Sequence, residues 1–298
     1  AQSIRNIEKQ SIFNEFNEKL GSIVSGNVNQ IQRDNIFITS ENAELSLPKE
    51  EQIPNDRYRR GESIRGVIVN VNLSSKGPEI VLSRSDNQFL IKLFEMEVPE
   101  IEDEIIEIKA VSRAPGERSK VVVYSSDMRI DAVGACVGMR GSRIQSIVRE
   151  LNGEKIDIIN FSDQPEILLT RAIAPAKPIN LLLDEERPYA LIVFEDDDLS
   201  TAIGRSGQNV QLASDVTGYT IDAISLSEYN KRNGIVDSNH LSTVKGFTEK
   251  LLGILDEHDI SLKDDFKSKR EEILEMKGFG EKTYQKLLEN IESESVDA

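Results

Sequence analysis

The sequence predicts a multidomain α+β protein with an N-terminal helix, a small closed β-barrel, two similar α/β units and a helical C-terminal segment. Three observations support this architecture. The 298 residues exceed the size of one ordinary domain. The spacing of apolar residues changes from a helical period to a period of two and back again. A Gly-x-x-Gly pattern occurs at residue 138 and again at residue 204, a separation of one small domain. We therefore expect modules at residues 1–20, 21–85, 86–161, 162–228 and 229–298.

The composition is typical of a protein that stays in water and in a reducing compartment. Charged residues make up 30% of the chain, and no apolar run approaches the ~18 residues of a membrane span. No signal-peptide pattern is present. The single cysteine, Cys136, cannot form an internal disulfide and is expected to be a small buried residue. We expect a cytoplasmic location, no membrane partner and no cofactor, and without paired cysteines His240 and His258 predict no metal site.

Residues 2–20 carry apolar side chains close to a 3.6-residue period over about five turns, which predicts an amphipathic helix rather than a solvated tail. Gly21 follows where a C-cap glycine is expected. Because the chain starts at Ala1 and its first residues already have a helical pattern, we expect that an upstream domain is absent.

Five short segments with period-two alternation follow, at residues 23–28, 35–39, 43–47, 64–71 and 79–83. Short strands at this density, separated by turn residues, predict a small closed barrel of the OB kind. Their order and spacing resemble a ribosomal S1-type RNA-binding domain. Such barrels stack bases on aromatic side chains. Phe37 and Tyr58 are the candidates here, and either could instead belong to the core.

The two α/β units share one order of elements. In the first, a helix from Gln88 and two strands precede the glycines, and a helix starting on a Ser142 cap and a strand follow them. The second repeats this order at residues 166–174, 179–183, 189–194, 199–203, 208–216 and 219–224. An α-β-β-α-α-β order with Gly-x-x-Gly between two helices is that of the bacterial, type II KH fold, which binds single-stranded nucleic acid.

The Gly-x-x-Gly sequences are the candidate binding loops. Paired glycines allow a tight turn and let a phosphate approach without a Cβ in the way. The following helix presents free N–H groups and its positive dipole end. Arg140 and Arg143 in the first copy and Arg205 in the second can add charge-assisted contacts. One such motif is weak evidence, since any helical corner can use it, but two in matching contexts favour a duplicated RNA-binding unit.

The distribution of charge along the chain favours attraction of nucleic acid by a local basic region over attraction by the whole surface. The net charge of −16 argues against a protein that coats nucleic acid. Residues 109–149 nevertheless hold eight basic residues against three acids, so the first loop is expected to lie in a basic island. An acidic run at residues 195–198 precedes the second loop, and we interpret it as a helix start rather than a cation site.

Beyond Tyr229 the chain is rich in charged helices. Two of them, joined by Gly278-Phe279-Gly280, resemble a helix-hairpin-helix whose glycines could bind a phosphate, with Lys277 and Lys282 nearby. The surrounding acids would repel nucleic acid, which favours a packing or protein-docking hairpin.

The order of an S1-type barrel followed by two type II KH domains resembles the NusA family of bacterial transcription elongation factors, over about residues 2–226. The resemblance implies a non-catalytic, monomeric factor that binds RNA emerging from RNA polymerase and modulates pausing, termination and antitermination. It also implies contacts with other transcription or ribosomal factors. Together with the loop chemistry, it predicts an RNA path lined by Gly138, Met139, Arg140, Gly141, Arg143, Gly204, Arg205, Ser206, Gly207, Gln208 and Asn209.

Two alternatives remain open at this point. One is an RNA-binding accessory or adaptor of an RNA-processing or ribosome-associated complex. The other is a structural adaptor whose KH folds bind protein, which the acidic composition would suit. No nucleophile paired with a base and no Walker loop is visible, in agreement with a non-enzymatic role.

Overall fold

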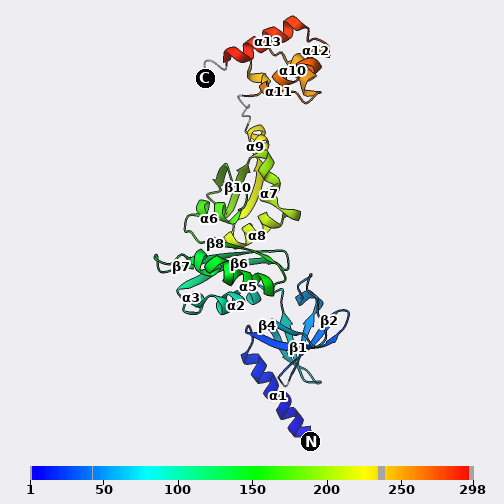
Figure 1. Cartoon of the computed structure of the whole chain (residues 1–298), viewed down its shortest axis with the longest axis vertical. Helices are drawn as coiled ribbons and strands as arrows, with labels where there is room; N and C mark the ends of the chain where they lie inside the picture. Colours follow the sequence, from blue (N-terminus) through cyan, green and yellow to red (C-terminus); the bar gives the residue numbers. More distant parts are fainter. Residues whose placement is uncertain (1, 42, 234–238, 295–298) are drawn as a thin grey trace. The chain divides into compact units, whose positions relative to one another are not determined.

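The computed structural model describes residues 2–41, 43–233 and 239–294. The chain divides into two compact units, Ala1–Ala223 and Ile224–Ala298, which are described separately. Figure 1 labels the elements along the chain. None of the helices in the described residues is long and apolar enough to cross a membrane.

The first unit begins with a helix and a closed barrel. The helix is α1 (Gln2–Glu18), and its Phe16 is buried against the barrel core. The strands are β1 (Ile23–Ile31), β2 (Asn35–Ser40), β3 (Ala43–Pro48), β4 (Ser63–Leu73) and β5 (Pro78–Ser83), closed in the order β1-β2-β3-β5-β4. Burial alternates along β2 and β3, because successive side chains of a strand point to opposite faces. The prediction of a helix followed by a small barrel is confirmed.

Two α/β domains follow the barrel. The first contains α2 (Asn87–Glu97), α3 (Pro99–Glu102), β6 (Ile106–Ala114), β7 (Arg118–Ser125), α4 (Ala132–Val137), α5 (Ser142–Glu150) and β8 (Lys155–Asn160). Its sheet has the order β6-β7-β8, with β7 and β8 parallel. The second contains α6 (Pro165–Ala172), β9 (Asn180–Leu183), β10 (Tyr189–Phe194), α7 (Leu199–Ile203), α8 (Gln208–Thr217) and β11 (Thr220–Ser225), with sheet order β11-β10-β9. Apart from the short α3, both follow the predicted α-β-β-α-α-β order.

The hydrophobic core of the second α/β domain extends onto the sheet of the first. On β7, Val121 and Val123 face the core of the first domain, whereas Val122 between them packs into the core of the second. Helix α8 accordingly lies against β6 and β7 (Figure 1). The Ser112 hydroxyl also donates to Asp215 Oδ2 of α8 at 2.8 Å. The second domain therefore rests directly on the sheet of the first.

A buried lysine adds a polar tie between these domains. Lys120 on β7 is fully buried, and its Nζ donates to Asp157 Oδ2 at 2.9 Å and to the Ala174 carbonyl oxygen at 3.1 Å. Arg118 donates to both oxygens of the same carboxylate. Burial lowers the pKa of Lys120 more than the charge of Asp157 raises it.

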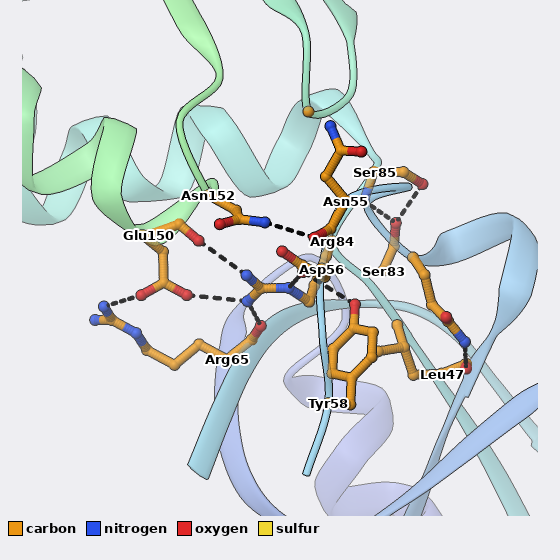
Figure 2. Close-up of polar contacts among 12 residues, drawn as sticks. Leu47, Asn55, Asp56, Tyr58, Arg65, Ser83, Arg84, Ser85, Glu150 and Asn152 are labelled. Carbon is orange, nitrogen blue, oxygen red and sulfur yellow. Dashed lines mark hydrogen bonds and ion pairs between the residues drawn. The ribbon is translucent and has the colours of Figure 1, made fainter. Parts of the chain in front are cut away.

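Arg84 fastens the barrel to the first α/β domain (Figure 2). Its side chain is only 7% exposed and donates to Asp56 Oδ2 at 2.7 Å and to Glu150 Oε1 at 2.9 Å. It also donates to the Glu150 carbonyl oxygen at the end of α5. Arg65 of β4 pairs with the same Glu150. Although burial alone would lower the pKa of Arg84, the charges of Asp56 and Glu150 raise it overall, so the guanidinium stays charged.

The second unit is a small helical domain with its own core. Its helices are α9 (Leu226–Arg232), α10 (Glu249–Asp256), α11 (Lys263–Ser268), α12 (Arg270–Glu275) and α13 (Glu281–Glu294). The Phe266 and Tyr284 rings stack at a centroid distance of 4.9 Å, and Phe279 from the Gly-Phe-Gly turn is 2% exposed beside them. The turn between α12 and α13 thus contributes its aromatic side chain to the core, as expected for a packing hairpin.

Candidate nucleic-acid interface

The two Gly-x-x-Gly loops have the same backbone conformation. The first glycine has φ/ψ of 74°/172° at Gly138 and 73°/175° at Gly204. The third residue is left-handed in both loops, with φ of 53° at Arg140 and at Ser206. Each loop is closed by a hydrogen bond from the last glycine N–H to the first glycine carbonyl. The sequence repeat is therefore also a repeat of geometry, down to the strained third position.

The first glycine of each loop is required on two grounds. Its φ/ψ lies in a region that only glycine occupies readily. A Cβ on Gly138 would also lie 2.7 Å from Arg143 Cγ, and one on Gly204 would lie 2.8 Å from Asn209 Cβ. The last glycine is in the ordinary left-handed region, and at Gly207 the space around a Cβ is open. The loops thus fold tightly over the first turn of the helix that follows.

Helices α5 and α8 both start without a side-chain cap. The prediction that Ser142 caps α5 is wrong, because Ser142 is already helical and the N-cap residue is the left-handed Gly141. Gly207 occupies the same place before α8. A glycine N-cap has no side-chain oxygen to bind the first N–H groups of the helix. Neither helix therefore has a side-chain cap beside the loop, and the first helical N–H groups, of Ser142 and Gln208, donate to the carbonyl oxygens of Met139 and Arg205.

The central residues of the loops project outward. Met139 is 84% exposed, and Arg140, Arg205 and Ser206 are exposed as well. For the described residues, the structure records no ion pair at Arg140 or Arg205, so each loop presents one cation that is free to bind an anion. Arg143 lies differently. Its Nη1 donates to Glu100 Oε2 at 2.9 Å and to the Ala135 carbonyl oxygen at 2.7 Å.

Gln208 and Asn209 at the start of α8 have structural partners. Gln208 donates to Glu117 Oε2 of the first α/β domain at 2.6 Å. Asn209 is 3% exposed, and its Nδ2 donates to the carbonyl oxygens of Ile173 and Ala202 at 3.0 Å each. Its Oδ1 has no hydrogen-bond partner among the described residues. Asn209 therefore holds the second loop from beneath instead of projecting from it.

The basic island of the first domain is largely neutralised by internal pairing. Of its eight basic residues, six form ion pairs within the described chain, among them Arg113, whose fully buried side chain pairs with Glu154. The structure records no such pair at Arg140 and Arg149. A count of charges along the sequence cannot reveal this for four of the six, because their partners Glu100, Glu154 and Asp157 are distant in the chain, whereas Lys109 and Arg129 pair with the nearby Glu107 and Asp127.

The other candidate residues are placed as follows. Cys136 is fully buried in α4, and burial raises its pKa to about 12. Tyr58 packs beside the barrel core, where burial raises its pKa and its hydroxyl donates to Asp56 at 3.0 Å (Figure 2). Phe37 is half-buried on β2. Within the described ranges no cluster of His, Cys, Asp and Glu has the arrangement of a metal site.

One feature of the interface leaves no pattern in the sequence. A pocket of about 560 Å³ lies beside the second loop and is lined by residues of all three modules, including Asn55 of the barrel, Lys155 at the start of β8 and Arg205. These residues are 50 and 100 positions apart in the chain, and no local pattern links them. Only the packing of the second α/β domain on the first brings them together.

Comparison with known proteins agrees with this domain order. Residues 84–161 match the family model of the NusA-like first KH domain, and residues 165–231 match that of the NusA-like second KH domain. The chain is 39% identical over 234 residues to the transcription termination/antitermination protein NusA of Rickettsia conorii and 38% identical over 234 residues to that of Rickettsia prowazekii. Each alignment covers 78% of this chain but 46% of the relative, so the chain spans about half the length of these relatives.

Proposed function

Since this chain is a NusA-type protein, we propose that it binds single-stranded RNA through its two KH domains and its S1-type barrel. The observation that carries the proposal is the shared conformation of the two loops, each with an exposed arginine and followed by a helix N-terminus without a side-chain cap. A phosphate lying on the glycines accepts hydrogen bonds from backbone N–H groups and meets the positive end of a helix dipole. The bases then lie against the adjoining helix and strand.

Within this proposal the predicted residues have three roles. Gly138, Gly141, Gly204 and Gly207 shape the loops, and Met139, Arg140, Arg205 and Ser206 meet the RNA. Arg143, Gln208 and Asn209 position the loops through the contacts described above. No catalytic residue is assigned, and the protein acts by binding.

The test is to replace Met139-Arg140 and Arg205-Ser206 together by Asp-Asp pairs. Aspartate tolerates the left-handed third position better than most residues, so the loops should keep their fold. We expect loss of single-stranded RNA binding by fluorescence anisotropy, with an unchanged circular dichroism spectrum. The matched control is Gln285→Asp with Lys286→Asp on the exposed face of α13, which changes the charge by the same amount as one loop swap. Undiminished RNA affinity of the loop variant would refute the proposal.

We further propose that RNA binding serves the control of transcription, with RNA polymerase as the protein partner. The relatives are transcription termination/antitermination proteins by name. In a transcription assay with purified bacterial RNA polymerase, added protein should change pausing or termination, and the double loop variant should lose this effect. RNA binding without any effect on transcription would instead favour an accessory role in RNA processing.

A further inference from the structure

We propose that the pocket beside the second loop, which we call the junction site, binds one RNA nucleotide between the barrel and the two KH domains. It is lined by Asn55, Gly116, Glu117, Arg118, Lys155, Gly204, Arg205, Gln208 and Asn209. This inference rests on the proposed RNA binding and extends it. The second loop would not hold RNA alone, because the first KH domain and the barrel complete its binding surface.

The junction site has the size and charge that a nucleotide requires. Its volume of about 560 Å³ lies within the range of roughly 300–1,000 Å³ of small-ligand sites. Lys155 and Arg205 are exposed, line the pocket from different domains and take part in no recorded ion pair of the described chain. Two cations facing one cavity from two domains can hold a single phosphate group.

The buried amide of Asn209 adds an unpartnered polar group to the wall of the junction site. Asn209 lines the pocket at 3% exposure, and its Oδ1 is the one buried side-chain oxygen or nitrogen without a partner among the described residues. Nearly all buried polar atoms have a hydrogen-bond partner, either protein or an ordered water or ion, so this oxygen needs a partner that the described residues do not supply. A nucleotide supplies phosphate oxygens for the two cations, and its hydroxyl and amine groups add donors beside the wall that Asn209 forms.

The walls of the junction site are fixed before RNA arrives. Gln208 Nε2 donates to Glu117 Oε2, which ties the second loop to the β6–β7 turn. Asn152 Nδ2 donates to the Asn55 carbonyl oxygen at 2.7 Å, which ties the barrel to the first KH domain (Figure 2). The same barrel segment contains Asp56, which Arg84 holds. Preformed walls reduce the entropy cost of binding.

Glu117 opposes the bound phosphate. Its carboxylate lines the pocket and is not engaged in a recorded ion pair, so it repels an anion while it holds Gln208. Glu117→Gln keeps an oxygen that accepts from Gln208 and removes the negative charge. The junction site therefore predicts opposite effects of two neutralising changes, with weaker RNA binding for Lys155→Gln and tighter binding for Glu117→Gln.

The experiment measures the affinity of the full chain for an unstructured single-stranded RNA as a function of salt. We expect Lys155→Gln to weaken binding about five-fold and to reduce the salt slope by about one, the effect of one lost phosphate contact. Glu117→Gln should tighten binding about two- to five-fold by removing a like charge. Lys177→Gln is the control, since Lys177 is exposed on the second KH domain and outside the junction site. Thermal unfolding should be unchanged in all three variants, whose side chains are exposed.

A double-mutant cycle tests whether the two cations hold the same phosphate. If they do, Lys155→Gln combined with Arg205→Gln should weaken binding by less than the product of the single effects. Equal affinities of Lys155→Gln and Lys177→Gln would overturn the junction site, as would independent effects of Lys155 and Arg205. Failure of the junction site would leave the proposed function standing if the two Asp-Asp loop swaps still abolish RNA binding in the same assay. A wild-type protein that binds no RNA would refute both.

Discussion

At the scale of single residues, the two glycines of the second loop differ in how well they tolerate replacement by alanine. Gly204 occupies a conformation reserved for glycine, and its Cβ would lie 2.9 Å from the Asn209 backbone nitrogen. Gly207 is left-handed but has open space around it. We expect Gly207→Ala to lower the free energy of unfolding by about 1 kcal/mol and Gly204→Ala by about 3 kcal/mol. Urea denaturation of both variants measures the difference, and equal losses would contradict the assigned conformations.

These loops show most clearly which features of the structure the sequence predicts. The spacing of the glycines and the elements around them were predictable, because a turn between two helices depends on local residues. The roles of Arg143 and Asn209 were not predictable. Glu100, which pairs with Arg143, and Ile173, which accepts from Asn209, are distant in sequence, so these loop-holding contacts appear only in the structure.

At the scale of elements, Asp157 on β8 links strand β7 to the segment after α6 through Lys120. Burial alone would raise the pKa of Asp157, but the hydrogen bond from Arg118 and the charge of Lys120 lower it below its ordinary value of 3.8. A carboxyl group whose pKa is lowered in the folded state stabilises the protein at pH values above its unfolded pKa. This contribution is lost as the pH falls through the folded pKa.

We therefore expect Asp157→Asn to lower the free energy of unfolding by about 2–3 kcal/mol at neutral pH, because it leaves Lys120 without its counter-charge. The difference between the variant and the wild type should shrink as the pH falls below 4. Chemical denaturation at several pH values tests this, with Asp163→Asn, an exposed carboxylate of the same region, as the control. A difference that is constant with pH would contradict the ion pair.

The strands and helices themselves were mostly predictable, and their mutual packing was not. Alternating residues such as Ile36 and Ile38 mark β2 as half-buried, which a closed barrel explains. The run of valines at 121–123 marks β7 only as a strand buried on both faces. The contact between its second face and α8 of the other domain depends on tertiary packing. For the same reason, no local sequence pattern reveals the junction site.

At the scale of the whole molecule, the second unit should fold without the first. Its core of aromatic and aliphatic side chains, centred on Phe266 and Tyr284, is drawn entirely from residues 241–291. A fragment of residues 239–298 should therefore give a helical circular dichroism spectrum and unfold cooperatively. Tyr284→Ala should abolish this transition, and exposed Lys286→Ala should preserve it. A fragment that is unfolded in isolation would show that this core needs the rest of the chain.

The packing of Val122 of the first KH domain into the core of the second also has a consequence for the proposed RNA binding. Because Val122 and α8 fix one domain on the other, the two loops are held at a constant separation. After one loop has bound, the second meets only those nucleotides that the intervening strand can place beside it, and its effective concentration depends on that length. The protein would then measure the distance between two short recognition elements, and the spacer between them would contribute to selectivity as much as the bases do.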